Sequence, residues 1–294
     1  MPCSLETRPA ISIVLPVHNG AAYLELALES VLAQSFTDFE LICVDDCSTD
    51  KTPDILSDYA RRDPRITIIR NTMNLKLPAA LNVGFRAARG DWLTWTSDDN
   101  ILRPNMLARL SEIAANNSSF DIFHADFTVI DELGNPGHRV TVDPADELIF
   151  GNVIGACFLY RRDVDATLGG YDENLFGIED YDFWLRASRQ FRFYQVHEDL
   201  YQYRRHGASL TSARAKTIHA MAATIMEREI RRLPPSTVRA KAWINLMCRD
   251  THQMRLTMIM RAFADDPGTT LSAMPRILRW MLYSVKQRVT HKPG

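Results

Sequence analysis

The sequence predicts an α/β fold with a mostly parallel central sheet flanked by helices, followed by a helical C-terminal extension. Short apolar, β-branched segments alternate with helical segments over the first hundred residues, which is typical of βαβ units. Acidic and amide residues cluster directly after the apolar segments, at the edge where parallel sheets bind ligands. Beyond residue 211 the pattern becomes helical and basic.

The first hundred residues predict four parallel strands joined by helices, from the spacing of apolar residues and from cap and stop residues. The strands are expected at Ile11–Leu15 (stopped by Pro16), Phe39–Val44, Ile66–Ile69 and Trp92–Thr96. The helices are expected at Tyr23–Leu32, from the cap residue Asp50 through Tyr59, and from Pro78 to Arg89, where Gly90 ends the helix.

The second hundred residues predict a less regular mixture of elements. They are a helix from Pro104 to Asn116, a strand at Ile122–Ile130, a hairpin turn at Leu133–Gly137, strands at Ala156–Tyr160, Phe193–Val196 and Leu200–Tyr203, and a helix at Glu179–Gln190. Helices continue from Thr211, with breaks at Pro234–Pro235 and Pro267–Gly268, because proline interrupts a helix. We therefore expect one domain over residues 1–211, with halves at about 10–100 and 101–211, and an extension over 212–294.

Composition indicates a globular, cytoplasmic protein. The 294 residues are 46% hydrophobic and 24% charged, which excludes disordered and collagen-like classes. No apolar stretch reaches the ~18 to 20 residues of a membrane-spanning helix, and Met1–Ala10 lacks the apolar core of a signal peptide. The five cysteines fit no disulfide or zinc pattern and are expected to be buried thiols: Cys3, Cys43, Cys47, Cys157 and Cys248.

Charge is divided unevenly along the chain. Residues 207–294 carry 15 Lys and Arg against 5 Asp and Glu, whereas residues 1–206 carry 19 against 31. The basic segment predicts an anionic partner. Its last helix has one apolar face, formed by Ile277, Leu278, Met281, Leu282, Val285 and Val289. Such a helix either lies on an anionic membrane, which would place the protein at the inner face of that membrane, or packs on the first domain or a second subunit.

Polar residues follow three of the predicted strands: His18–Gly20, Asp45–Asp50 and Ser97–Asn100. Carboxylates gathered at one edge repel one another, and a divalent cation relieves that repulsion. Oxygen ligands favour Mg²⁺ or Mn²⁺ over zinc. Each acidic cluster alone also fits a turn, a helix cap or a solvated loop. A single glycine after the first strand argues against a dehydrogenase, and the sequence has no P-loop motif.

These residues belong to a series of motifs with a family resemblance. In order, the sequence contains PVHNG (16–20), SVLAQS (30–35), DDCSTD (45–50), NLKLPAALNVGFRAARGD (74–91), TSDD (96–99), GGYDENLFGIEDYDFWLR (169–186) and YRRHGASLT (203–211). Together they resemble the catalytic domain of family 2 glycosyltransferases, which have the GT-A fold. The resemblance covers residues 10–211.

The resemblance implies a role for particular residues of the donor site. The nucleotide-sugar would be bound by Pro16, Val17, Asn19, Asp45, Asp46, Asn74, Asn82 and Asp98. Asp99, with Asp98, matches the DXD-type motif that holds Mn²⁺ or Mg²⁺ on the diphosphate, and His206 matches a histidine that reaches the metal. A histidine at such a position is otherwise a surface residue.

The resemblance also implies the residues that act on the acceptor. Asp180, beside Glu179, matches the general base, although acidic residues at a helix start also serve as plain caps. Asp182 is the nearest rival. Trp184 would stack on an acceptor sugar or serve as a core aromatic residue.

Three positions depart from the family pattern. Thr96 stands where many members have an acid, Leu81 stands where many have an arginine, and Lys76 stands where many have a glycine. Without an acid at Thr96, only Asp98 and Asp99 of this motif would bind the metal. Leu81 cannot make the cationic contact of an arginine to the sugar donor, and Lys76 offers a replacement charge.

We therefore expect an inverting, metal-dependent hexosyl- or N-acetylhexosaminyltransferase that uses a nucleotide-sugar, by family habit a UDP-sugar. Its acceptor would be a glycan or lipid-linked glycan in bacterial-type polysaccharide synthesis, with no nucleic-acid partner. The alternatives are a nucleotidyltransferase and a homologue that binds nucleotide-sugar without turnover. The sequence specifies neither the sugar, the linkage nor the oligomeric state.

Overall fold

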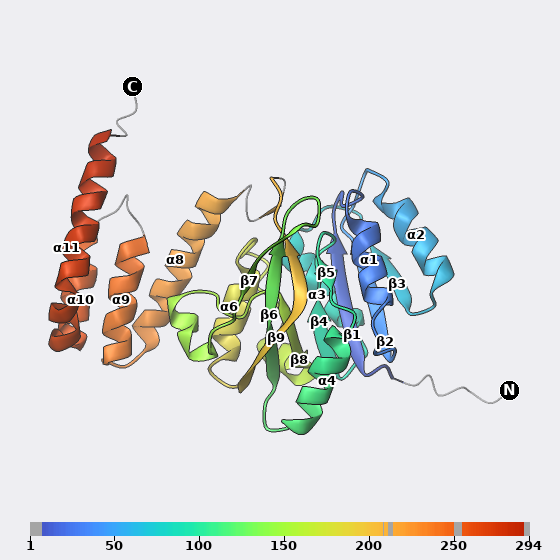
Figure 1. The fold of residues 1–294 in the computed structure, drawn as a ribbon, viewed down its shortest axis with the longest axis horizontal. Helices are drawn as coiled ribbons and strands as arrows, with labels where there is room; N and C mark the ends of the chain where they lie inside the picture. The colour runs from blue at the N-terminus through green and yellow to red at the C-terminus, as the bar shows by residue number, and fades with distance from the viewer. Residues whose placement is uncertain (1–7, 208, 211–213, 250–254, 291–294) are drawn as a thin grey trace. The chain divides into compact units, whose positions relative to one another are not determined.

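The computed structural model describes residues 8–207, 209–210, 214–249 and 255–290. The chain forms two compact units (Figure 1). The N-terminal unit comprises Met1–Leu148 and Asn152–Ala215, and the C-terminal unit comprises Ile149–Gly151 and Lys216–Gly294. The domain boundary expected between residues 211 and 212 lies outside the described residues.

The first part of the chain alternates strands and helices. Its elements are β1 (Ile11–Val17), α1 (Leu24–Leu32), β2 (Phe39–Asp45), α2 (Thr52–Arg62), β3 (Ile66–Arg70), α3 (Leu77–Ala87) and β4 (Trp92–Trp95). The following elements are β5 (Ile101–Leu102), α4 (Met106–Asn116), β6 (Ile122–Ile130), β7 (Pro136–Val140), η1 (Ala145–Phe150), β8 (Cys157–Arg161), α5 (Arg162–Leu168), α6 (Glu179–Ala187) and β9 (Phe193–Arg204).

The strands form one sheet in the order β3-β2-β1-β4-β8-β6-β9-β5, with β7 paired to β6. Strands β1 to β4 are parallel to one another, and β9 is parallel to β6. The chain runs outward from β1 to β3 and then places β4 on the other side of β1 (Figure 1). The carboxyl ends of β1 and β4 therefore flank a topological switch point, where open α/β sheets bind ligands.

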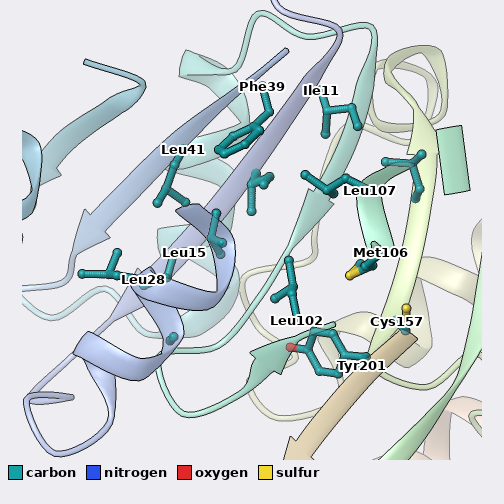
Figure 2. Close-up of a cluster of buried hydrophobic side chains, with 14 of the residues drawn as sticks. Ile11, Leu15, Leu28, Phe39, Leu41, Leu102, Met106, Leu107, Cys157 and Tyr201 are labelled. Carbon is teal, nitrogen blue, oxygen red and sulfur yellow. The ribbon is translucent and has the colours of Figure 1, made fainter. Parts of the chain in front are cut away.

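Helices cover both faces of this sheet. Odd-numbered residues of β1 pack with α1, α2 and α4 in one hydrophobic core. Figure 2 shows part of it, including Ile11, Leu15, Leu28 and Leu107. Helix α3 covers the opposite face, where a Cβ on Gly84 would lie 2.4 Å from Val14 Cγ1. Gly84 thus allows α3 to approach the sheet closely.

Strand β1 continues through Pro16, where the sequence predicted its end. Val14 O accepts a hydrogen bond from Thr96 N, so the even-numbered residues of β1 turn their backbone groups toward β4. Pro16 faces the same side, at the end of that ladder. The β1–β2 ladder uses the other residues and continues to Val17 opposite Asp45. The missing N–H of proline therefore ends one ladder without interrupting the other.

Strand β9 is one long strand, not the two expected at Phe193–Val196 and Leu200–Tyr203. Its pairing with β6 shifts register between Ala125 and Phe127, which is typical of a bulge. Two helices are shorter than predicted: α3 ends at Ala87 instead of Arg89, and α6 ends at Ala187 instead of Gln190. The short elements β5, α5 and η1 were not predicted, since so few residues carry no recognisable period.

The C-terminal unit contains α8 (Ala215–Arg232), α9 (Thr237–Arg249), α10 (Leu256–Asp265) and α11 (Pro267–Thr290). The break expected at Pro234–Pro235 lies between α8 and α9. The second break falls one residue earlier than expected, and Pro267 begins α11, since proline suits a first helical position. The helix start expected at Thr211 is outside the described residues. None of the helices, as far as they are described, is long and apolar enough to cross a membrane.

The cysteines that the structure describes are free thiols. Cys43 and Cys157 are buried, as expected, and burial raises the pKa of Cys43 to about 12. Cys47 and Cys248 are partly exposed, and Cys3 lies outside the described residues.

Candidate active site

The loops after β1 and β4 meet at the switch point. A Cβ on Gly20 would lie 1.7 Å from Asp98 Oδ2 and 2.6 Å from Val17 Cγ2. Glycine at this position therefore makes room for the Asp98 carboxylate. Pro16 and Val17, which were expected at the nucleotide pocket, are buried at the end of β1 directly before this loop.

Asn19 links the loop after β1 to the loop after β2. Its φ of 56° places it in the left-handed region, which asparagine tolerates better than most residues. Asn19 N donates to Ser48 Oγ at 2.9 Å, and Asn19 Oδ1 accepts from Thr49 N at 2.8 Å. These bonds fix the two loops side by side, although they are 29 residues or more apart in the sequence.

The carboxylates of Asp45 and Asp46 are both buried and bonded to the protein itself. Asp45 Oδ1 accepts from Ser48 N at 2.9 Å, and Asp45 Oδ2 lies 3.3 Å from Arg70 Nε. Asp46 accepts from Asn71 Nδ2 at 2.8 Å and from the backbone N–H of Leu75 at 2.9 Å. These two residues therefore shape the loop that follows β3.

That loop contains a strained residue. Lys76 has φ 74° and ψ 163°, a region occupied almost only by glycine. Its N–H donates to Asp46 Oδ2 at 2.9 Å and to Asn74 Oδ1 at 3.0 Å. The glycine common at this position in the family thus has a conformational reason, and here Asp46 and Asn74 hold a lysine in the same backbone shape.

Asp99, the residue that follows Asp98, contacts His206. His206 Nε2 lies 3.0 Å from Asp99 Oδ2, with both side chains largely buried. Asp99 Oδ1 is buried and has no hydrogen-bond partner among the described residues. Burial, the neighbouring Asp99 and Asp50 raise the pKa of Asp98 to about 7. The raised pKa indicates that the Asp98 carboxylate has too little positive charge nearby to stabilise its ionised form.

A buried arginine supports this pair, and sequence reasoning gave it no role. Arg204 is 2% exposed, and its Nε donates to Asp99 O at 2.8 Å. Its Nη1 donates to Asp131 O at 3.1 Å. Its guanidinium lies 4.6 Å from the centre of the Tyr23 ring, which also contacts the ring of His206. The YRRH segment in the last motif was the available signal.

The predicted base lies at the start of α6. Asp180 Oδ2 accepts from Asn152 Nδ2 at 2.8 Å, and Oδ1 accepts from Tyr181 N at 2.7 Å. Burial raises the pKa of Asp180, and burial together with Asp180 raises the pKa of Glu179. Glu179 is almost fully buried. Asn152 had no signal in the sequence, because it lies in an irregular segment.

Two other expectations for α6 can now be judged. The rival base Asp182 is buried and pairs with Arg186 Nε at 2.7 Å. Trp184 is fully buried, and its ring packs against Phe158 and Phe193. The expectation that Trp184 stacks on an acceptor sugar is therefore wrong, because Trp184 lies on the apolar face of α6 and its ring packs in the core.

Asn82 holds the GGYDE segment rather than pointing free into the crevice. Its Nδ2 donates to Tyr171 O at 2.9 Å, and its Oδ1 accepts from Tyr171 N at 2.9 Å. A cavity of about 540 Å³ lies beside these bonds. Among the residues that line it are Asn82, Arg86, Gly170, Asp172 and Glu173.

Two of the departures from the family pattern lie in the core. Thr96 is 2% exposed, and its Oγ1 is 2.7 Å from Tyr201 OH. Leu81 is fully buried. Both side chains are uncharged and turned away from solvent, so neither position offers a charge to a ligand.

The expected metal ligands do not form a single cluster. Among the described residues, no group of three or more His, Cys, Asp or Glu side chains is arranged to hold a metal. Asp99 and His206 are in contact, whereas Asp98 Oδ2 lies against Gly20. The donor set nevertheless fits a divalent cation, because Asp99 Oδ1 has no partner among the described residues and belongs to the carboxylate whose Oδ2 contacts an imidazole nitrogen.

Comparison with known proteins identifies the family. Residues 12–169 match the sequence model of Glycosyl transferase family 2. The chain belongs to this family. The resemblance seen in the motifs is confirmed.

Two relatives illustrate the extent of the similarity. An uncharacterized protein, y4gI, from Sinorhizobium fredii is 31% identical over 220 residues, which cover 72% of this chain and 24% of that protein. The chain thus matches about a quarter of that relative's length. A putative teichuronic acid biosynthesis glycosyltransferase, TuaG, from Bacillus subtilis is 29% identical over 233 residues, covering 77% of this chain and 90% of TuaG.

Solved structures show the same fold. Residues 1–349 of S. aureus TarS, in complex with UDP-GlcNAc, align with a TM-score of 0.65 and 16% identity over 90% of this chain and 91% of that chain. The mannosyltransferase PcManGT from Pyrobaculum calidifontis, in complex with GDP-Man and Mn²⁺, aligns with a TM-score of 0.58 and 16% identity over 96% and 85%. The GT-A fold predicted from the motifs is thereby confirmed.

Proposed function

We propose that this glycosyltransferase moves a sugar from a UDP-sugar to a hydroxyl group of a glycan or lipid-linked glycan, with inversion at the anomeric carbon and with a divalent cation. The observation that carries this proposal is the unpaired Asp99 carboxylate oxygen beside His206, at the carboxyl end of the parallel strands. A site short of positive charge at this edge suits a ligand that arrives with a cation.

The donor would lie over the loops that Asn19, Asp45 and Asp46 hold together. Asp98 at the end of β4 would contact the ribose, with Asn74 and Asn82 completing the site through the loops that they fix. The TarS complex with UDP-GlcNAc and the TuaG name support a UDP-sugar and a polysaccharide acceptor as the classes to test first.

Asp180 would act as general base. It takes the proton of the acceptor hydroxyl while that oxygen forms a bond to the anomeric carbon, and the bond from that carbon to the diphosphate oxygen breaks with its electron pair leaving on UDP. One displacement inverts the anomeric centre. Asn152 orients the Asp180 carboxylate through its hydrogen bond, and burial raises the pKa of both Asp180 and Glu179.

Asp99 and His206 would hold Mn²⁺ or Mg²⁺, with Asp98 close by. When bound, the cation supplies positive charge against the negative charge that develops on the departing diphosphate. Arg204 keeps Asp99 in place through its backbone carbonyl.

Incubation with a panel of nucleotide-sugars, with and without Mn²⁺, tests the proposal. We expect release of nucleoside diphosphate from a UDP-sugar, loss of that release on chelation and in Asp99→Ala, and a product of inverted anomeric configuration by NMR. Release of pyrophosphate from a nucleoside triphosphate would instead indicate a nucleotidyltransferase. Binding of UDP-sugar without release in the presence of glycan acceptors would indicate a homologue that does not turn over its ligand.

A further inference from the structure

Helix α11 of the C-terminal unit carries an exposed row of leucines. Leu271, Leu278 and Leu282 are 60%, 51% and 73% exposed. At about 100° per residue they fall within about 40° of one line along the helix. Ile277 and Ser284, on another side of α11, are fully buried. The single apolar face predicted from the sequence is therefore divided between packing and exposure.

Positive charge flanks this row without a compensating acid. Helix α11 contains no Asp or Glu in its 24 residues. Arg276 and Arg279 are exposed, and neither has an ion-pair partner among the described residues. Arg231, Arg232 and Arg239 of the same unit, by contrast, pair with Glu227, Glu229 and Asp265. The charge beside the leucine row is thus left for a partner outside the unit.

We propose that α11 docks on an anionic membrane surface. The leucine row would enter the boundary between headgroups and acyl chains, while Arg279, roughly 60–100° around the helix from the three leucines, would reach the anionic headgroups from the flank. Arg276 lies roughly 120–160° from the row and adds its charge from the far side of the helix. An exposed apolar row beside unpaired cations is the pattern of a helix that lies in a membrane interface. Arginine suits that position because its apolar stem can lie along the interface while its charge stays wet.

Charge favours a membrane over a second copy of this chain. A symmetric dimer through the leucine row would bring the same patch together from both subunits, so that the Arg279 side chains of both subunits would lie beside the interface without an acid on either α11. An anionic lipid surface supplies the opposite charge over the whole length of the helix. The docking does not depend on the reaction proposed above.

Vesicle flotation of the full chain tests the proposal. We expect the protein to float with vesicles that contain phosphatidylglycerol, less with phosphatidylcholine alone, and less as salt is raised. Arg279→Gln should lower affinity about fivefold, and Arg276→Gln, on the far side of the helix, should lower it less. Leu278→Glu with Leu282→Glu should abolish flotation, and Leu278→Ser with Leu282→Ser should weaken it. The matched control is Leu26→Glu, because Leu26 on α1 is 50% exposed and lies in the N-terminal unit.

Far-UV circular dichroism and UDP binding of each variant show whether the chain is still folded. Flotation lost in the α11 variants and kept in Leu26→Glu supports the proposal. Absence of flotation in the wild type overturns it, as does flotation that the leucine variants retain. A dimer seen by light scattering that Leu278→Glu dissociates, without vesicle binding, would assign the row to a second copy instead.

Discussion

Replacing Gly20 with alanine tests whether the position of Asp98 controls donor binding. The added Cβ would lie 1.7 Å from Asp98 Oδ2 and 2.6 Å from Val17 Cγ2. Val17 is buried at the end of β1, where its strand pairs with β2, so Asp98 and its loop must move. Overpacking of this kind costs about 1 to 3 kcal/mol of stability. Loss of the hydrogen bond that a ribose hydroxyl would donate to the Asp98 carboxylate would cost about 1.5 to 3 kcal/mol of binding, or roughly 10- to 150-fold in UDP affinity.

Calorimetric titration with UDP and Mn²⁺, together with thermal unfolding, measures both effects. Gly268→Ala is the control, because its Cβ would lie at an ordinary distance, 3.5 Å from Asp266 Oδ1. We expect Gly20→Ala to be folded, with a lower melting temperature and the loss in affinity given above. The expected loss of over about 1.4 kcal/mol corresponds to more than a tenfold loss of affinity. A UDP affinity of Gly20→Ala within about threefold of wild type would therefore refute the role given to Asp98.

Three further outcomes are expected. Asn152→Ala removes a hydrogen bond that lowers the pKa of Asp180, so the acidic limb of the pH–rate profile should move to higher pH; an unmoved limb would contradict the positioning role. Glu40 is buried, yet its hydrogen bonds lower its pKa from 4.5, so urea unfolding should show Glu40→Gln to be less stable by about 1 to 3 kcal/mol at neutral pH, a difference lost as pH falls through the lowered pKa. Lys76→Gly should raise the free energy of unfolding by about 1 kcal/mol through relief of strain, and a decrease would show that this backbone is unstrained.

Much of the fold could be predicted because its signals are local. Apolar runs such as Phe39–Val44, and turn residues such as those at Leu133–Gly137, are read within a few residues. Pro16 misled the prediction because its effect depends on which neighbouring strand its backbone faces. The length of β9 depends on a bulge against β6, which no single segment contains.

The candidate site divides in the same way. Strand-end acids such as Asp98 and Asp99 could be found from the sequence, since strand ends and the ligand edge coincide in parallel sheets. The contact between Asp99 and His206 joins residues 107 apart, and the bond from Asn152 to Asp180 crosses from an irregular segment to a helix. Only the folded chain brings such pairs together.

The sequence by itself determined the family, the α/β class and the edge of the sheet at which the proposed site lies. The tertiary structure decided which polar groups are occupied by the protein and which are left for a ligand. It turned Trp184 into the core, bound the Asp46 carboxylate to its own loop and left Asp99 Oδ1 without a partner in the described part of the chain. The physical reason is that burial and hydrogen-bond pairing depend on neighbours from distant segments, whereas propensity and spacing are properties of the chain alone.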